Sequence, residues 1–328
     1  MKLLAFWVAL SLGVAAQTDP SRDFKLPPEQ NTPQQPRVIE VPLLDCSGLP
    51  CLEMSTASGK TLRLLIDTAE ANSYLDIKAA QPLGANLQAL NGDTVSQVQQ
   101  TVVPGAKIGD LAMGDFPFMV LDTTPQPNQP GDKLPPFPAD GALTYRAFQN
   151  RLLRIDYGHH VVRLSEPLDS AQTCPQTCSD LVVKRIGSYG PATLTTGGFS
   201  VNGQPVEAQI DTLFTGTLLI YPASIEKLGL KKLAKAKHKE FFPFTQGGVR
   251  LAQAEGATES FQDLQLGQGL PLYFFTADDH PNAVSFDGTV GSGLLNHATA
   301  VFDFKGMHFW LETGGGAPKA APPRPPQR

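Results

Sequence analysis

The amino-acid sequence predicts a mainly β protein in which two related lobes follow one another, with only a few short helices. The first observation is composition: 17% charged residues with 30 glycines and 29 prolines is typical of a turn-rich β protein. The second is hydrophobic patterning, because short apolar or alternating runs separated by turn residues predict strands. Such runs lie at residues 61–66, 116–121, 206–210 and 270–275. The third is an internal repeat.

The repeat consists of landmarks that occur in the same order in both halves. In each half an apolar strand leads into Asp-Thr, and Asp211 follows Asp67 by 144 residues. Later landmarks are separated by 147 to 153 residues, as small loop insertions would produce. The other matched pairs are residues 110–114 with 263–267, Asp140 with Asp287, Asp156 with Asp303, and residues 161–164 with 308–311.

The repeat divides the chain. We expect a first lobe over residues 38–168, a linker with one cysteine pair over 169–180, and a second lobe over 181–313. At 328 residues with 41% hydrophobic content, the chain can build both cores. Residues 17–37 predict a flexible leader and 314–328 a disordered Pro-rich tail.

Few helices are predicted. The clearest stretch is residues 223–239, whose lysines we interpret as a solvated helical face rather than a site for an acidic partner. The net charge of −5 argues against nucleic acid or an anionic membrane as a partner.

The N-terminus predicts export. Lys2 precedes an apolar run over residues 3–14, and small residues suit cleavage after Ala16, so residues 1–16 read as a signal peptide. The alternative is a buried first helix. The run is too short to span a bilayer stably, so we expect an exported protein, periplasmic or secreted, with no stable membrane span after cleavage.

Four cysteines agree with export. Cys46 and Cys51 flank one short loop, and Cys174 and Cys178 flank another, so local disulfides are the simplest of three connectivities. A zinc site is the rival, although no histidine lies beside either pair and the six histidines form no ligand spacing. We expect no metal and no cofactor.

Only two of the four Asp-Thr pairs occupy equivalent places in the repeat. These are Asp67-Thr68 and Asp211-Thr212, whereas Asp93 and Asp122 lie among turn residues. Two carboxyl groups held together share one proton, so one can activate a water while the other donates to a carbonyl oxygen. The alternative is that both are ordinary turn residues after strands.

These motifs resemble the retropepsin-like and pepsin-like aspartic proteases. The resemblance covers most of residues 38–313 and occurs once in each copy of the repeat. It implies two acid-protease-like β-barrel lobes related by a pseudo-twofold axis, a substrate cleft between them, a β-hairpin flap within residues 91–103 and no cofactor. It also implies Asp67 and Asp211 as catalytic residues, supported by Thr68 and Thr212.

The chain departs from the family pattern at three glycines. Ala69 and Leu213 stand where each Asp-Thr-Gly would end. Thr144 replaces the buttressing glycine of the first copy, whereas Val290-Gly291 matches that element in the second. Glycine permits close backbone approach, so these changes bear on activity more than on fold.

Two functions follow. The leading one is an exported aspartic endopeptidase that hydrolyses peptide bonds of a peptide or protein substrate. The alternative is a catalytically silent relative that binds peptides or a protein partner through the cleft between the lobes; no specific feature supports a purely structural envelope protein. The sequence leaves the oligomeric state open, and a monomer is compatible with it.

Overall fold

The computed structural model describes residues 38–83, 88–89, 99–125, 134–166, 175, 177–185, 192–243, 248–275 and 284–312. The predicted signal peptide, leader and Pro-rich tail lie outside these ranges, as does Cys174. The fold is mainly β with short helices, as predicted. In the described ranges, no helix is long and apolar enough to cross a membrane.

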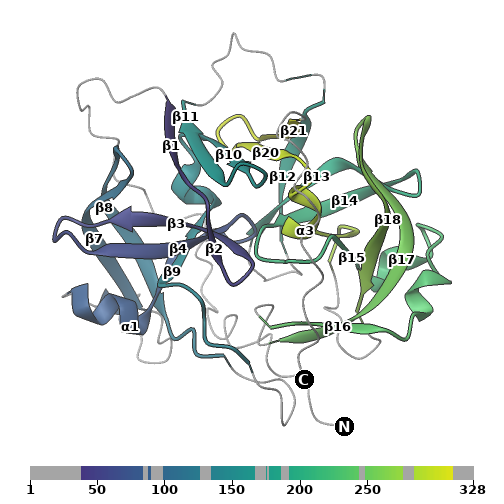
Figure 1. The fold of residues 1–328 in the computed structure, drawn as a ribbon, viewed down its shortest axis with the longest axis horizontal. Helices are drawn as coiled ribbons and strands as arrows, with labels where there is room; N and C mark the ends of the chain where they lie inside the picture. Colours follow the sequence, from purple (N-terminus) through teal and green to yellow (C-terminus); the bar gives the residue numbers. More distant parts are fainter. Residues whose placement is uncertain are drawn as a thin grey trace.

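The first lobe is an eight-stranded sheet with the order β2-β3-β4-β9-β5-β8-β7-β6. It occupies one side of the molecule (Figure 1). Its strands are β2 (Leu44–Cys46), β3 (Leu49–Ser55), β4 (Thr61–Asp67), β5 (Tyr74–Asp76), β6 (Gln88–Ala89), β7 (Gln99–Ile108), β8 (Leu111–Leu121) and β9 (Gly141–Thr144). Its helical turns are α1 (Ile77–Ala80), η2 (Gln81–Leu83) and η4 (Tyr145–Phe148).

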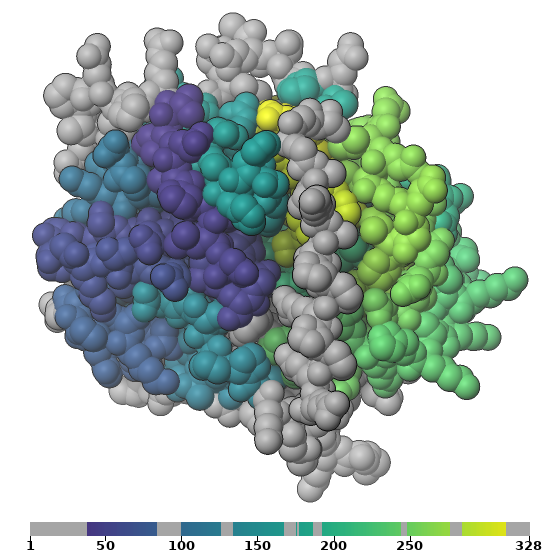
Figure 2. Space-filling model, in the orientation of Figure 1, coloured from purple at the N-terminus to yellow at the C-terminus, as the bar shows by residue number. Residues whose placement is uncertain are grey.

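The second lobe repeats this plan on the other side of the molecule (Figures 1 and 2). Its strands are β13 (Ala192–Val201), β14 (Gln204–Asp211), β15 (Leu218–Ile220), β16 (Lys239–Phe242), β17 (Val249–Phe261), β18 (Leu264–Phe274) and β19 (Gly288–Gly291). Its helical turns are α2 (Pro222–Ile225), η5 (Leu233–Lys235) and α3 (Ser292–Leu295).

Six strands between the lobes join the two copies. They run in the order β1-β11-β10-β20-β21-β12, so each copy contributes three neighbouring strands, and β10 pairs with β20 antiparallel at the junction. These strands are β1 (Val38–Pro42), β10 (Leu152–Asp156), β11 (Val161–Ser165), β12 (Ser179–Arg185), β20 (Thr299–Asp303) and β21 (His308–Glu312). The last two residues of the predicted linker, 179 and 180, already belong to β12.

Strand pairing reproduces the sequence repeat. β4 pairs in parallel with β9, as β14 does with β19, while β5 and β15 cross back antiparallel to those partners. The crossing is tight: a Cβ on Gly141 would lie 2.1 Å from the Tyr74 carbonyl oxygen, and one on Gly288 would lie 2.2 Å from that of Leu219. Glycine is required at both places, which explains the repeated Asp-Gly.

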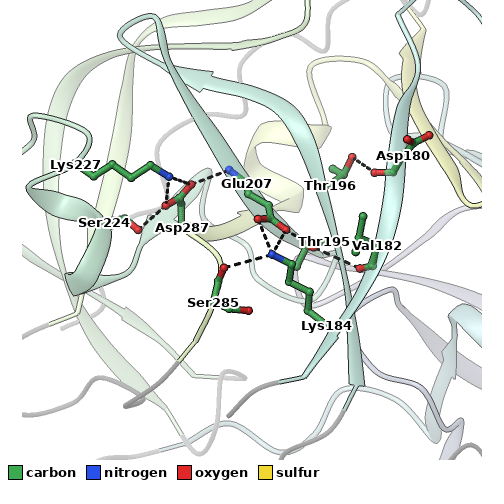
Figure 3. Close-up of polar contacts among 10 residues, drawn as sticks. All are labelled: Asp180, Val182, Lys184, Thr195, Thr196, Glu207, Ser224, Lys227, Ser285 and Asp287. Carbon is green, nitrogen blue, oxygen red and sulfur yellow. Dashed lines mark hydrogen bonds and ion pairs between the residues drawn. The ribbon is translucent and has the colours of Figure 1, made fainter. Parts of the chain in front are cut away.

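The aspartates before these glycines secure the crossing. Asp140 accepts a hydrogen bond from the Arg63 N–H at 2.8 Å, and Asp287 accepts one from the Glu207 N–H at 3.0 Å. Asp287 also accepts hydrogen bonds from Ser224 and Lys227 (Figure 3). A motif found twice in the sequence therefore has one structural role in both lobes.

The central strand β4 separates two apolar layers. Leu64 and Ile66 face the main core, which runs through both lobes, while Leu65 faces a smaller cluster with Cys46, Leu49, Cys51 and Ala142. Both faces of β4 are covered, so its last four residues are all buried. This burial fixes the direction in which the chain delivers Asp67.

The predicted helix over residues 223–239 is wrong in extent. Only α2 and η5 form within it, and the last residue, Lys239, begins strand β16. The helix ends because Gly229 takes a positive φ of 69°, and the Leu230 N–H turns back to the Ile225 carbonyl. Leu228 and Leu230 are thereby buried, so core packing outweighs helix continuation.

Two further predictions concern the cysteines and the flap. Cys46 and Cys51 form a disulfide that joins β2 to β3, as predicted. Cys178 is also disulfide-bonded, and its expected partner Cys174 lies outside the described residues. Residues 91–98 of the proposed flap lie outside them too, and the remainder of that range opens β7.

Candidate active site

The two Asp-Thr turns lie together where the lobes meet. Asp67 is the last residue of β4 and Asp211 the last residue of β14. Each strand is held centrally in its sheet, between an antiparallel neighbour and the parallel strand β9 or β19. The sheets therefore present both turns from rigid strand ends.

Reciprocal threonine hydrogen bonds connect the turns. The Thr68 hydroxyl donates to the Ile210 carbonyl at 2.9 Å, and the Thr212 hydroxyl donates to the Ile66 carbonyl at 2.5 Å. Each hydroxyl also accepts from the opposite threonine N–H, at 3.2 and 3.3 Å. Both threonines are fully buried. The two threonines thus have the same contacts in opposite directions, as a pseudo-twofold axis requires.

Each carboxylate is oriented by its own turn. Asp67 Oδ1 accepts from the N–H groups of Ala69 and Glu70 at 3.0 and 3.2 Å. Asp211 Oδ1 accepts from those of Leu213 and Phe214 at 2.8 and 3.2 Å. Within the described ranges, the second oxygen of each carboxyl group makes no hydrogen bond. Asp67 is buried, whereas Asp211 is partly accessible.

Burial and mutual repulsion set the protonation of the pair. Burial, followed by the charges of Asp211 and Glu70, raises the pKa of Asp67 well above its ordinary value. Burial raises the pKa of Asp211 to about 6, against the opposing effect of its two N–H donors. Two such carboxyl groups hold one proton between them over a broad pH range.

Two titratable residues beside the pair, Glu70 and Tyr74, were not predicted from the sequence. Burial and the charge of Asp211 raise the pKa of Glu70 to about 7; solvent also reaches this side chain, so screening reduces the effect. Burial, then the charges of Asp67, Glu70 and Asp211, raises the pKa of the Tyr74 phenol. Tyr74 follows Asp67 by seven residues across a turn, and no sequence period signals that proximity.

The bulky Leu213 is accommodated between the lobes. Its side chain packs against the apolar cluster of the first lobe that contains Leu49, Leu65 and Ala142. Leu213 therefore contributes to the contact between the lobes instead of forcing them apart. The same contact places a large apolar side chain next to the Asp211 turn.

Thr144 takes the place of a glycine with a local rearrangement. In the second lobe, Gly291 is tightly enclosed, because an added Cβ would lie 2.2 Å from the Phe214 carbonyl oxygen. In the first lobe, the Thr144 hydroxyl donates to the Ala71 carbonyl at 3.0 Å, and its N–H donates to the Ser73 hydroxyl at 3.1 Å. The threonine therefore buttresses its loop through a side chain, where the second lobe uses close backbone packing.

Asp122 and His159 make their contacts elsewhere. Asp122 accepts from the Thr124 N–H at 3.0 Å, as expected for a turn residue, and Asp93 lies outside the described residues. His159 lies 2.9 Å from Asp156 in the turn between β10 and β11. Within the described ranges, no group of three or more His, Cys, Asp or Glu residues could hold a metal ion.

Solved structures share this architecture at low sequence identity. The aspartic proteinase from Irpex lacteus is 12% identical, with a TM-score of 0.50 over 86% of this chain and 99% of that chain. The chain has the pepsin-like two-lobe fold. Conglutin gamma, a basic 7S globulin from lupine seeds, is 11% identical, with a TM-score of 0.44 over 85% of this chain and 96% of its own.

A shorter structure matches part of the chain. A retropepsin-like aspartic protease from Rickettsia conorii is 16% identical, with a TM-score of 0.28 over 39% of this chain and 90% of its own. No protein-family model and no curated protein matches the chain. At these identities, the likeness to solved structures establishes the fold alone.

Proposed function

We propose that the protein is an exported aspartic endopeptidase in which Asp67 and Asp211 activate a water molecule. The observation that carries this proposal is the reciprocal hydrogen bonding of Thr68 and Thr212, which holds the Asp67 turn against the Asp211 turn. A purely structural pair of turns would not require two carboxyl groups with raised pKa values at this contact.

The reaction uses one proton shared by the pair. The ionised carboxylate takes a proton from water, whose oxygen bonds to the scissile carbonyl carbon, while the protonated carboxyl group donates to the carbonyl oxygen. The resulting tetrahedral diol then collapses: its C–N bond breaks, one hydroxyl gives its proton to the ionised carboxylate, and the other carboxyl group donates the proton that it took from water to the leaving nitrogen. No metal or covalent intermediate enters this sequence.

A peptide-binding protein without hydrolytic activity is the second candidate. Leu213 favours it, because this large side chain lies between the lobes beside the Asp211 turn. Retention of both aspartates favours the peptidase. For either function we propose export to the periplasm or the extracellular space, with which the Cys46–Cys51 disulfide is compatible.

Cleavage of a mixed peptide library tests the proposal. The mature protein is incubated with the library from acidic to neutral pH beside Asp67→Asn, Asp211→Asn and a matched control, Asp122→Asn, from an Asp-Thr turn outside the pair. We expect cleavage by the wild type and the control only. Cleavage that persists in both pair variants contradicts the mechanism, and saturable peptide binding by a folded wild type that does not cleave supports the second candidate.

A further inference from the structure

A continuous chain of buried polar groups runs through the second lobe and ends at the first active-site turn. The Tyr221 hydroxyl lies 3.0 Å from the Thr289 hydroxyl, which donates to Gln209 Oε1 at 3.3 Å. Gln209 Nε2 donates to the Thr193 hydroxyl at 2.7 Å, and Thr193 donates to the Ala69 carbonyl at 3.0 Å. All five residues are buried.

Chemistry fixes the direction of this chain. A carbonyl oxygen can only accept, so the single Thr193 proton points to Ala69, and Gln209 must present its amide NH₂ group to Thr193. The Gln209 oxygen then accepts from Thr289, which leaves Tyr221 as the donor to Thr289. Every hydrogen bond therefore points toward the first lobe, an arrangement in which each bond polarises the next.

The chain continues to Asp67 through one peptide group. The Ala69 carbonyl that accepts from Thr193 and the Glu70 N–H that donates to Asp67 Oδ1 belong to the same peptide unit. Donation to this carbonyl polarises the peptide and strengthens its N–H as a donor. A side chain of the second lobe thereby acts on a carboxylate of the first.

The polar chain has no counterpart in the other lobe. The residues equivalent by the repeat to Thr193, Gln209 and Thr289 are Leu49, Leu65 and Ala142. These three belong to the apolar cluster against which Leu213 packs. The apolar surface of the first lobe thus contacts the Leu213 side chain. At the corresponding place, the polar surface of the second lobe binds the backbone carbonyl of Ala69.

We propose that Thr193 and Gln209 are positioning residues that fix and polarise the Ala69–Glu70 peptide group and so stabilise the ionised form of Asp67. This inference rests on the proposed function for its catalytic consequence, but not for its effect on the carboxyl group. The charged and titratable groups that face Asp67 are Asp211, Glu70 and Tyr74. None of them belongs to the polar chain.

The test measures the pKa of Asp67 by carboxyl-carbon NMR in the full mature protein, with Asp67→Asn to assign the signal. Thr193→Val removes the donor, and Thr193→Ser restores it. Thr196→Val is the matched control, because Thr196 lies on the same strand and donates at 2.8 Å to the Asp180 carbonyl, away from the site (Figure 3). Gln209→Leu interrupts the chain one step earlier and introduces the residue found at the equivalent position, Leu65.

We expect Thr193→Val to raise the pKa of Asp67 by roughly half a unit to one unit, and Gln209→Leu to raise it less. Thr193→Ser and Thr196→Val are expected to leave it unchanged. An equal pKa in Thr193→Val and Thr196→Val, or a shift that Thr193→Ser fails to reverse, overturns the inference. If Thr193→Val does not fold, an unchanged pKa of Asp67 in Gln209→Leu overturns the inference.

Catalysis provides the second measurement. Because burial and the charge of Asp211 raise the pKa of Asp67, Asp67 holds the proton shared by the pair. The alkaline limb of kcat/KM, where this proton is lost, is expected to move upward in Thr193→Val by the same amount as the carboxyl pKa, and to stay in place in Thr196→Val. A wild-type protein that cleaves no peptide contradicts the proposed function, while the NMR comparison still decides the positioning role. A limb that does not move although the carboxyl pKa does overturns the catalytic part of the inference.

Discussion

Replacing Thr212 by valine tests the hydrogen bonds that hold the two turns together. Valine keeps the size of the side chain but removes the hydroxyl that donates to Ile66 at 2.5 Å and accepts from the Thr68 N–H at 3.2 Å. Both groups then lose this partner at a buried contact, because Ile66, Thr68 and Thr212 are all buried. At about 1–3 kcal/mol for each unsatisfied group, the free energy of unfolding should fall by about 2–6 kcal/mol.

Urea-induced unfolding, followed by circular dichroism, measures this loss. Thr212→Ser is the control, because it retains the hydroxyl and removes only one methyl group, for which we expect about 1 kcal/mol. Thr68→Val should cost as much as Thr212→Val, since the contacts are reciprocal, and the double variant should lose less than the sum. A Thr212→Val variant that is no less stable than Thr212→Ser would show that these hydrogen bonds do not stabilise the contact between the turns.

Three further predictions concern pH and buried charge. The pKa of Asp211 is about 6, so kcat/KM should decrease when the pH is lowered past about 6, because the pair then loses its ionised carboxylate. An activity maximum far below pH 6 contradicts the role of Asp211 as that carboxylate. Glu259 is buried, neither of its carboxyl oxygens has a hydrogen-bond partner in the described ranges, and burial raises its pKa from 4.5 to about 8. Its ionisation therefore opposes folding as pH rises from 4.5 to 8, by on the order of 4 kcal/mol, and urea unfolding at both pH values should show that Glu259→Gln removes this loss. Burial alone would raise the pKa of Asp287, but hydrogen bonds from Lys227 and Ser224 bring it below the ordinary value. The free energy of unfolding should therefore fall as the solution is acidified through that pKa. Asp287→Asn should cost about 1–3 kcal/mol at neutral pH, and this variant should lose no further stability in acid.

The repeat made the architecture predictable from sequence. Asp140-Gly141 and Asp287-Gly288 recur because strand crossings in both lobes need a residue without a side chain and an aspartate to accept a backbone hydrogen bond. Such local requirements leave a fixed trace in the sequence. The same holds for Cys46 and Cys51, whose short loop brings them close enough to bridge.

The long helix predicted at residues 223–239 fails for the opposite reason. Its composition suits a helix, but burial of Leu228 and Leu230 and the positive φ of Gly229 end α2 early. Local propensity contributes a few tenths of a kcal/mol for each residue, whereas burying a leucine contributes about 2 kcal/mol. The tertiary contact therefore prevails.

The two lobes, and Asp67 and Asp211 as equivalent residues, could be predicted from the sequence, because strands and turns follow from patterns within one copy. How the two copies complement each other is visible only in the folded protein. Leu213 packs on an apolar surface of the first lobe, and the polar chain that ends at Ala69 links residues scattered over more than 200 positions. Contacts between the copies produce no periodic pattern in the sequence, because each contacting residue packs against residues of the other lobe that lie far away along the chain.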